Sequence, residues 1–395
     1  MIAESTSLAK QMHFYVIKNH EDDNYEIFFC TDMQHPKKQC DLFIVYFNNK
    51  HESLKEIQLD VDRKKFDFLT ILGTASQPNG VLITVGLSKT VEYGRPDYYT
   101  PIVEGGSVYD HFISLYYIPK DSVRPKSCMI DLKGDVFPYA ALYTYNPFAG
   151  ALNSLLFSNH AYDYSFGLNK VVGDVKSCFF MKINEEDMSL SFNRIKDSIA
   201  NSFLKQQTDT SYYFGGNPLT MFTNENGLST LVSTSARNHE DPKALSLYNY
   251  SYSSQYIGIT QFDDYGNELW GTVLPGPQSY WQQQQRYRLP VSGTNVCYWN
   301  KNVYIVYNDY NENFNNTLKE QGNPIYNYTF TNAFYYRVSS HREITKHYLF
   351  GPPQKHEYRH ISQMYFDDKR GVYAALVSSK KNGKATLNMA WSHLE

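Results

Sequence analysis

The stretch Val296-Cys297-Tyr298-Trp299-Asn300-Lys301-Asn302-Val303-Tyr304-Ile305-Val306-Tyr307 shows the unit from which the chain is built. Residues 296–299 and 303–307 are mostly β-branched or aromatic, the residue types that strands favour. Three polar residues separate the two runs, and Asn tolerates the positive φ that a tight hairpin turn requires. The stretch therefore predicts two antiparallel strands joined by a short turn.

This hairpin recurs along the whole chain. Its turns close on Asn or Gly at positions 24, 80, 150, 227, 302 and 371, which are 56 to 77 residues apart. A second hairpin follows the first in five of the six units, and the sixth unit shows only a third strand, at residues 385–390. The second hairpins pair residues 42–46 with 54–59, 112–118 with 126–130, 178–183 with 189–192, 256–262 with 268–274 and 334–338 with 343–349. Four antiparallel strands per repeat are typical of the blades of a β-propeller.

We therefore predict an all-β fold, a single six-bladed β-propeller of four-stranded antiparallel blades that spans residues 1–395. The ring is expected to close when an N-terminal strand near residues 5–10 joins the last blade, which also covers an exposed sheet edge. Seven blades, or two successive β-sandwiches, are the alternatives. One helix is predicted at residues 194–207, where apolar residues recur at helical spacing.

The composition excludes several classes of protein. The 395 residues carry a net charge of −3, which leaves no basic footprint for nucleic acid. Hydrophobic residues make up 42 %, too many for a disordered chain, yet no apolar run reaches the length of a membrane-spanning helix. The 35 Tyr and 24 Phe are unusual, and Tyr combines an apolar ring with a polar tip suited to binding surfaces.

The cysteines and the two chain termini give information about the cellular compartment of the protein. Five Cys are too few for a disulfide scaffold, although Cys30 and Cys40 flank a short loop and could form a bridge. The chain opens Met1-Ile2-Ala3-Glu4-Ser5 without a basic region and a following apolar stretch, so no signal peptide is visible, and Leu394-Glu395 looks like a cloning scar. We expect that a leader peptide is absent from this sequence, so the N-terminus does not argue for the cytoplasm.

Three segments carry a resemblance to known propellers. Residues 261–270, Gln-Phe-Asp-Asp-Tyr-Gly-Asn-Glu-Leu-Trp, resemble the D-x-x-G-x-E-x-W hairpins of bacterial propellers and are similar to the docking-tryptophan motif of quinoprotein dehydrogenases. That motif is one residue shorter here and occurs in one blade only. Residues 302–309 and 274–278, the latter echoed by 350–354, look like segments of uncharacterised secreted propellers of anaerobic gut bacteria. This resemblance implies a propeller fold and an extracytoplasmic address (periplasmic, cell-surface or secreted), and it implies no activity.

The loops of a propeller differ between its two rims. Loops between strands two and three share one rim with the loops between blades, and here those loops are long and aromatic, whereas the hairpin turns are short and polar. Flat aromatic faces beside Arg and amide groups suit sugar rings, and the same residues are enriched in protein hot spots. The predicted binding residues are Tyr98, Tyr99, Tyr162, Tyr164, Arg237, His239, Trp281, Arg286, Tyr287, Arg288, Tyr310, His356, Tyr358 and Arg359.

We predict a non-catalytic extracytoplasmic protein that binds a glycan or a protein partner through this rim. The alternative is a carbohydrate-active hydrolase or lyase that uses rim carboxylates, since glycosidases need two carboxyl groups held close together. The candidate acids are Asp97, Glu104, Asp110, Asp163, Asp174, Glu240, Asp241 and Asp309, and none lies in a recognisable motif.

No cofactor is expected, with one alternative. Residues 309–320 place oxygen-bearing side chains, among them Asp309, Asn311, Asn313 and Glu320, at the ligand positions of a calcium loop. Phe314 stands where that loop requires Gly for its bend, so an Asn-rich loop that hydrogen-bonds to itself is the favoured interpretation. The twelve His match no zinc motif.

Overall fold

The computed structural model spans residues 1–395. It describes residues 12–18, 24–31, 42–61, 65–66, 68–77, 79–92, 108–131, 137–159, 162–163, 170–171, 177–184, 187–195, 199–208, 217–240, 250–282, 294–318, 330–367, 370–381 and 383–394. The described chain forms two compact units, and each is considered by itself.

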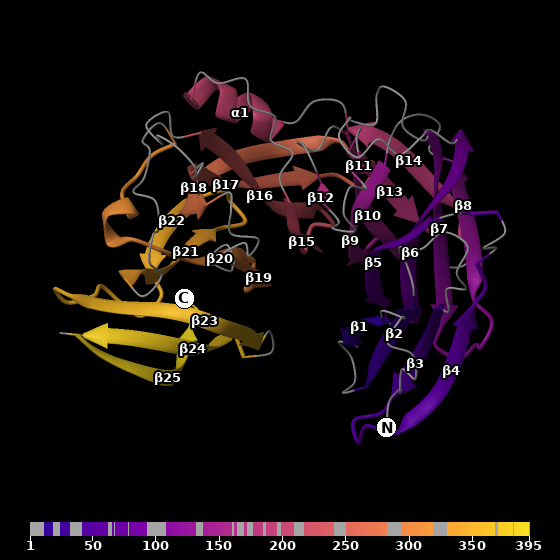
Figure 1. Ribbon diagram of the computed structural model, residues 1–395, viewed down its shortest axis with the longest axis horizontal. Coiled ribbons are helices and arrows are strands. Elements are labelled where there is room, and N and C mark those ends of the chain that lie inside the picture. Colours follow the sequence, from indigo (N-terminus) through magenta and orange to yellow (C-terminus); the bar gives the residue numbers. More distant parts are fainter. Residues whose placement is uncertain are drawn as a thin grey trace. The chain divides into compact units, whose positions relative to one another are not determined.

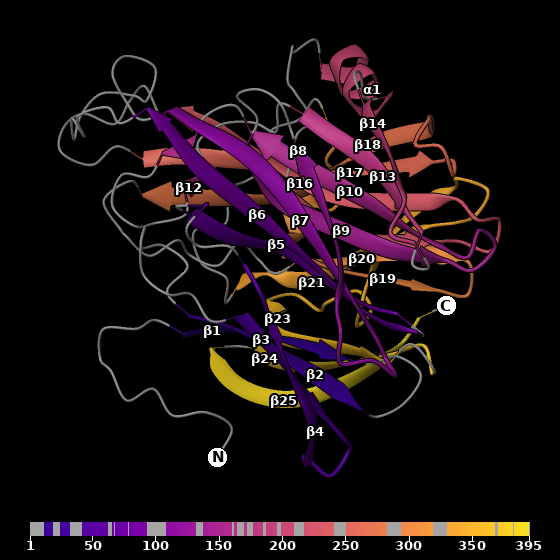
Figure 2. The same ribbon diagram turned by 90° about the vertical axis from the view of Figure 1, so that its right-hand side faces the viewer.

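The first unit comprises Met1–Lys196 together with Asp264–Asn267. It holds three four-stranded antiparallel sheets and one two-stranded hairpin (Figure 1). The first sheet consists of β1 (Met12–Lys18), β2 (Tyr25–Thr31), β3 (Leu42–Phe47) and β4 (Ser53–Leu59). The second consists of β5 (Phe68–Gln77), β6 (Gly80–Glu92), β7 (Val108–Pro119) and β8 (Lys126–Asp131), whose strands lie side by side in Figure 2. The third consists of β9 (Phe137–Asn146), β10 (Ala151–Asn159), β13 (Ser177–Ile183) and β14 (Leu190–Ile195), and the hairpin of β11 (Tyr162–Asp163) and β12 (Lys170–Val171).

The second unit comprises Asp197–Asp263 and Glu268–Glu395. Helix α1 (Ile199–Thr208) precedes a four-stranded sheet of β15 (Asn217–Thr223), β16 (Ser229–Glu240), β17 (Tyr250–Phe262) and β18 (Glu268–Gln282). The next repeat consists of β19 (Asn295–Trp299), β20 (Asn302–Asp309), β21 (Asn332–Val338) and β22 (Ile344–Tyr348), with the short helix η2 (Asn311–Asn313) after β20. The last three strands are β23 (Glu357–Asp367), β24 (Val372–Lys381) and β25 (Lys384–His393), and one parallel contact of β23 with β21 makes these seven strands one sheet.

Successive sheets pack against each other within each unit. In the first unit, one apolar cluster joins the sheet of β1–β4 to that of β5–β8, and another joins β5–β8 to the third sheet. In the second unit, one cluster joins β15–β18 to the repeat of β19–β22, and another joins that repeat to β23–β25. The chain is therefore all-β, with antiparallel four-stranded sheets stacked in sequence order, as propeller-like folds have them.

Two details of the strands differ from the sequence prediction. Gly80 and Asn302 are the first residues of β6 and β20 and do not have a positive φ; the positive φ of the fifth turn belongs to Asn300 (46°) and Lys301 (64°). Position 80 has no room for a side chain, because a Cβ there would lie 2.3 Å from the carbonyl oxygen of Ile118. The sequence predicts a loop between strands two and three of the fourth repeat at residues 237–255. Residues 237–240 and 250–255 of this range belong to β16 and β17 instead.

The helix begins later than predicted. Arg194 and Ile195 belong to β14, where they pair with Phe179 and Cys178, and α1 begins at Ile199. Its buried side is formed by Ala200 and Leu204, which pack on Val273. No described helix is long and apolar enough to cross a membrane.

Several predictions about the chain ends and cysteines fall outside the described residues. These are the closing strand at residues 5–10 and the partner cysteine Cys40, so ring closure and the Cys30–Cys40 bridge stay predictions. Leu394 is buried, and its N–H donates to Gly371 O at 3.2 Å.

Candidate functional site

The structure places only part of the predicted binding face. Tyr98, Tyr99, Tyr164, Arg286, Tyr287 and Arg288 lie outside the described residues. Tyr162 lies in β11, opposite Val171. The other described residues of the face lie in the second unit, at or next to the ends of β16, β18, β20 and β23.

Three predicted residues that the sequence assigns to loops lie in strands instead. Arg237 and His239 pair with Ser254 and Tyr252 at the end of β16, and Trp281 pairs with Ser251 near the end of β18. The backbone pairing thus brings these three residues to one end of one sheet.

A second group of predicted residues lies at the ends of β20, β21 and β23. Asn332 connects them, because its Nδ2 donates to Asn311 Oδ1 at 2.9 Å and its own Oδ1 accepts the N–H of Arg359 at 2.8 Å. Asn311 directly follows Tyr310, and Arg359 directly follows Tyr358. The start of β21 and the start of β23 therefore share one rim, as the topology of a propeller predicts for these connections. We call Tyr310, Phe330, Tyr358, Arg359 and Lys380 the strand-end surface.

The two aromatic rings of this surface contact each other, and the ammonium group of Lys380 contacts one of them. The rings of Phe330 and Tyr358 meet edge to face, with centroids 5.2 Å apart, and Lys380 Nζ lies 4.2 Å from the centre of the Phe330 ring. Tyr358 and Lys380 are direct partners between β23 and β24. Both rings are partly exposed, so an apolar face and an ammonium group are presented together.

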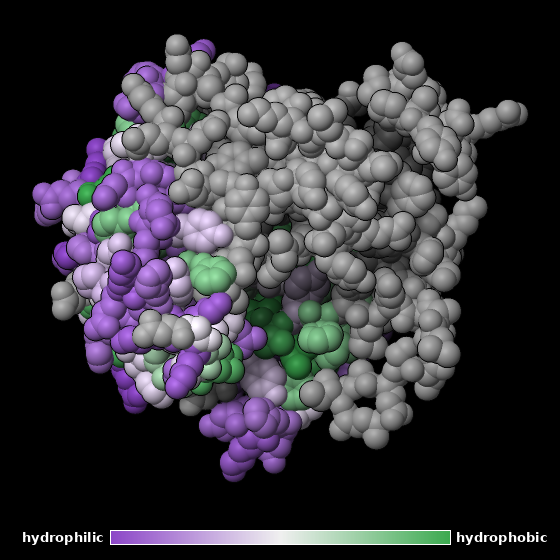
Figure 3. All heavy atoms as spheres, turned by 60° about the vertical axis from the view of Figure 1, so that its left-hand side comes forward, coloured by the Kyte–Doolittle hydropathy of each residue, from purple (hydrophilic) through white to green (hydrophobic). Residues whose placement is uncertain are grey.

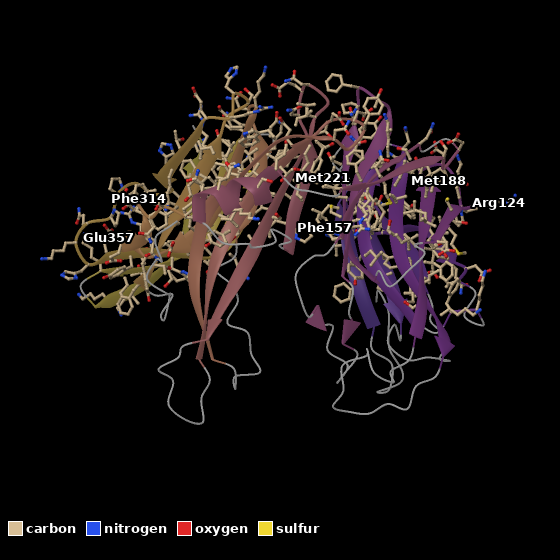
Figure 4. The ribbon with its side chains drawn as sticks, turned by 90° about the horizontal axis from the view of Figure 1, so that it is seen from above. Arg124, Phe157, Met188, Met221, Phe314 and Glu357 are labelled. Atoms are coloured by element: carbon tan, nitrogen blue, oxygen red, sulfur yellow. The ribbon has the colours of Figure 1, made fainter. Side chains whose placement is uncertain are left out.

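Arg359 is held in place by its neighbours. Its guanidinium donates to Phe350 O and to Glu357 Oε1, the latter at 3.0 Å. Glu357 Oε2 also accepts the N–H of Gln354 at 3.0 Å, and these hydrogen bonds hold the pKa of Glu357 below its ordinary value. His356 precedes this pair in an exposed turn with a φ of 60°. Figure 4 labels Glu357 and Phe314, which both belong to this part of the second unit.

His360 lies beneath the surface. Its Nδ1 is 2.9 Å from Thr331 Oγ1, and burial lowers the pKa of its imidazole. A neutral, hydrogen-bonded ring in this position supports the strand ends.

The loop that resembles a calcium site is hydrogen-bonded to itself. Asp309 Oδ1 accepts the N–H of Tyr310 at 2.8 Å and Nδ2 of Asn313 at 2.7 Å, and Asn313 Oδ1 accepts Nδ2 of Asn316 at 3.2 Å. Phe314 stacks on Tyr348 with centroids 4.5 Å apart. Glu320 lies outside the described residues, and within the described part of the chain no three His, Cys, Asp or Glu side chains cluster as metal ligands. The calcium alternative stays a prediction.

Below this loop lies a lysine that the sequence analysis missed. Lys346 Nζ donates to the carbonyl oxygens of Asn313 and Phe314 at 3.2 and 2.8 Å. Its ammonium is also 5.2 to 5.8 Å from the ring centres of Tyr307, Phe314, Phe334 and Tyr336. The sequence could have predicted that Lys346 points inward, because Ile344, Lys346 and Tyr348 alternate along β22 and therefore share its inward face.

Burial shifts the pKa values of Asp309, Lys346 and Tyr336. It raises the pKa of Asp309 to about 7 and lowers the pKa of Lys346 to about 8. Burial also raises the pKa of Tyr336 to about 12, so its hydroxyl stays protonated and donates to Pro275 O at 2.9 Å. Asp309 is only 2 % exposed, which makes it a support of the loop and leaves it inaccessible to a polysaccharide.

No protein-family model and no curated protein sequence matches the chain. The hydrazine synthase of Kuenenia stuttgartiensis aligns with 92 % of this chain and 79 % of its own, with 9 % identity and a TM-score of 0.40. The Trypanosoma rangeli sialidase in complex with the inhibitor DANA aligns with 95 % of this chain at 6 % identity and a TM-score of 0.37, and a cobalt-substituted Synechocystis apocarotenoid oxygenase aligns with 68 % at 11 % and 0.32.

This chain covers 53 % of the sialidase chain and 64 % of the oxygenase chain. All these TM-scores are too low to support an argument about architecture or activity. The case for a propeller rests on the order and packing of the sheets.

Proposed function

We propose that the chain is a single-domain, six-bladed β-propeller exported from the cytoplasm. On this proposal it belongs with secreted bacterial propellers and binds a glycan or a protein partner through its aromatic rim without catalysis. The repeat of four antiparallel strands, stacked in sequence order within each unit, supports the blade architecture. Residues 5–10 would supply the fourth strand of the last blade, beside β25. The resemblance of residues 302–309 to secreted propellers supports the extracytoplasmic address.

One observation carries the binding role. Asn332 connects the loop of Tyr310 to the strand of Tyr358 and Arg359, so these side chains are presented on a rigid frame. Rigid aromatic side chains bind with little loss of conformational entropy, and Arg supplies directed hydrogen bonds. The alternative of a hydrolase or lyase gains less support. Among the acids described near this surface, Asp309 is buried and Glu357 is engaged by Arg359 and Gln354, which leaves the exposed Glu312, whereas a glycosidase needs two carboxyl groups.

The test is a binding screen of the full chain against glycans and envelope proteins, followed by Tyr358→Ala and Trp281→Ala. A binder loses about tenfold or more in affinity in at least one of these variants, while Asp163→Asn and Asp241→Asn bind as before. Release of reducing sugars or unsaturated products that stops in an acid variant would instead establish a glycoside hydrolase or polysaccharide lyase. Failure of every glycan and protein ligand to bind would overturn the proposal.

A further inference from the structure

The strand-end surface continues into a concentration of positive charge. At this end of β23, β24 and β25 lie Lys355, Arg359, Lys380, Lys381 and Lys384, which we call the basic patch. Lys355 lies in the turn before β23 and Arg359 near its start, whereas Lys380, Lys381 and Lys384 lie at the turn between β24 and β25. Lys381 pairs with Glu357 on one side and with Lys384 on the other. Lys355, Lys381 and Lys384 are exposed.

Acidic residues are scarce here. Residues 372–394 contain no Asp or Glu, and residues 350–366 contain only Glu357. The other acid described in these three strands, Asp367, lies at the opposite end, beside Arg370. Five cations against one carboxylate make the patch strongly positive on a chain whose net charge is −3. In Figure 3, which brings forward the left-hand side of Figure 1, the coloured surface is mainly hydrophilic.

One cation of the basic patch, Lys380, lies directly at the aromatic rings. Lys380 covers Phe330, which meets Tyr358, and Lys381 Nζ donates to Gln354 Oε1 at 2.8 Å. Lys381 and Lys384 are direct cross-strand partners, so their side chains share one face with Cβ atoms about 5 Å apart, a spacing comparable with one sugar unit, whereas Lys380 lies on the other face of the sheet end beside Tyr358. A neutral sugar chain would stack on the rings alone and leave the positive charge of the patch uncompensated.

We propose that the ligand of this surface is an anionic polysaccharide, with carboxylate or sulfate groups on successive sugars. Its charged groups bind the basic patch while the C–H faces of its sugars stack on Phe330 and Tyr358. This inference rests on the proposed binding function and specifies its substrate class. A nucleic acid is disfavoured, because the patch holds only five cations and the chain as a whole is acidic.

The experiment compares three polymers that share one backbone: dextran, carboxymethyl-dextran and dextran sulfate. Each is titrated by calorimetry against the full chain, at low and at physiological salt. We expect binding of at least one charged form, none of dextran, and an affinity that falls as salt rises. The two charged polymers separate recognition of carboxylate from recognition of sulfate.

A triple variant, Lys380→Met with Lys381→Met and Lys384→Met, should weaken this binding by about tenfold or more. The matched control removes the same charge from the exposed lysines Lys50, Lys65 and Lys205 and should bind as the parent does. Circular dichroism of both variants checks that the sheets are retained.

Equal losses in the two triple variants would overturn the inference, because net charge alone would then explain binding. Equally tight binding of duplex DNA or polyglutamate would overturn it too, by showing attraction to any polyanion. Binding of neutral glycans that ignores the lysines would refute the inference and leave the proposed function standing.

Discussion

Asn308 and Ile361 exchange two hydrogen bonds. Asn308 Nδ2 donates to Ile361 O at 2.8 Å, and Ile361 N donates to Asn308 Oδ1 at 2.9 Å. The side-chain amide of β20 thereby pairs with the backbone of β23 as a neighbouring strand would. Both residues are buried, so this amide satisfies backbone groups that water cannot reach.

Asn308→Ala should therefore lower the free energy of unfolding by about 2 to 4 kcal/mol, since it leaves a buried N–H and a buried C=O unpaired. Urea unfolding followed by tryptophan fluorescence measures the change. Asn388→Ala, at an exposed position of β25, is the control and should change stability by less than about 0.5 kcal/mol. A loss for Asn308→Ala as small as that of the control would show that the pair contributes nothing.

Gly266 and Gly150 allow a steric cost to be separated from a backbone cost. Both have a positive φ, 83° and 57°, but a Cβ on Gly266 would lie 2.5 Å from Phe180 Cβ, whereas nothing lies within 4 Å of one on Gly150. Gly150→Ala should cost about 1 to 2 kcal/mol for the left-handed backbone alone. Gly266→Ala should cost about 1 to 3 kcal/mol more, because Phe180 must move. Thermal unfolding of the two variants makes the comparison, and equal losses would contradict it.

The interior pair of Asp309 and Lys346 should make stability depend on pH in two limbs. Burial raises the pKa of Asp309 from 3.8 to about 7, with Glu312 adding to the shift, and lowers that of Lys346 from 10.5 to about 8. Between pH 4 and 7 the folded protein therefore binds more protons than the unfolded chain at Asp309, so stability falls as pH rises. Between pH 8 and 10.5 the unfolded chain binds more protons at Lys346, so stability rises.

Asp309→Asn tests the lower limb, because Asn keeps an oxygen that can accept from Tyr310 and Asn313. Its free energy of unfolding should fall less steeply than that of the parent between pH 4 and 7, as measured by urea titration at several pH values. Lys346→Met should flatten the upper limb in the same way. Identical pH profiles for parent and variants would place the titration elsewhere.

The strands could be predicted from the sequence, because each run of β-branched and aromatic residues is bounded by a turn that contains Gly or Asn. Gly150, Gly227 and Gly371 do adopt the positive φ expected of turn residues. Gly80 does not have a positive φ. Glycine is required there because a backbone oxygen of β7 lies too close for a side chain, and a single sequence carries no record of such tertiary contacts. The start of α1 was misplaced for a similar reason, because pairing with β13 holds Arg194 and Ile195 in a strand despite their helical spacing.

The sequence predicted which aromatic and arginine residues lie at the candidate site. It did not predict the residues that contact them and hold them in place. Tyr310, Tyr358 and Arg359 were named from aromatic loops, and hydrogen bonds through Asn332 connect the strand ends that carry them. Asn332 and Lys380 were not named, since an Asn at a strand start and a Lys at a strand end are ordinary in any sheet. Their importance arises from cross-strand register, which fixes Tyr358 beside Lys380 and Asn332 beside Arg359.

A tyrosine hydroxyl joins successive sheets in both units. Tyr116 donates to Asp60 O at 3.1 Å in the first, and Tyr336 donates to Pro275 O at 2.9 Å in the second. Each Tyr lies on the third strand of its repeat, and each acceptor follows or belongs to the fourth strand of the repeat before it. The repeated placement indicates that the hydroxyl is a recurring sheet-to-sheet contact.

Tyr116→Phe and Tyr336→Phe should each lower the free energy of unfolding by about 1 kcal/mol, the usual net value of such a hydrogen bond. The losses should add in the double variant, because the two residues share no partner. Urea unfolding of the three variants, analysed with a common slope, measures both effects. A phenylalanine variant as stable as the parent would show that its hydroxyl can be lost without cost, and the packing of the ring alone would then hold that pair of sheets together.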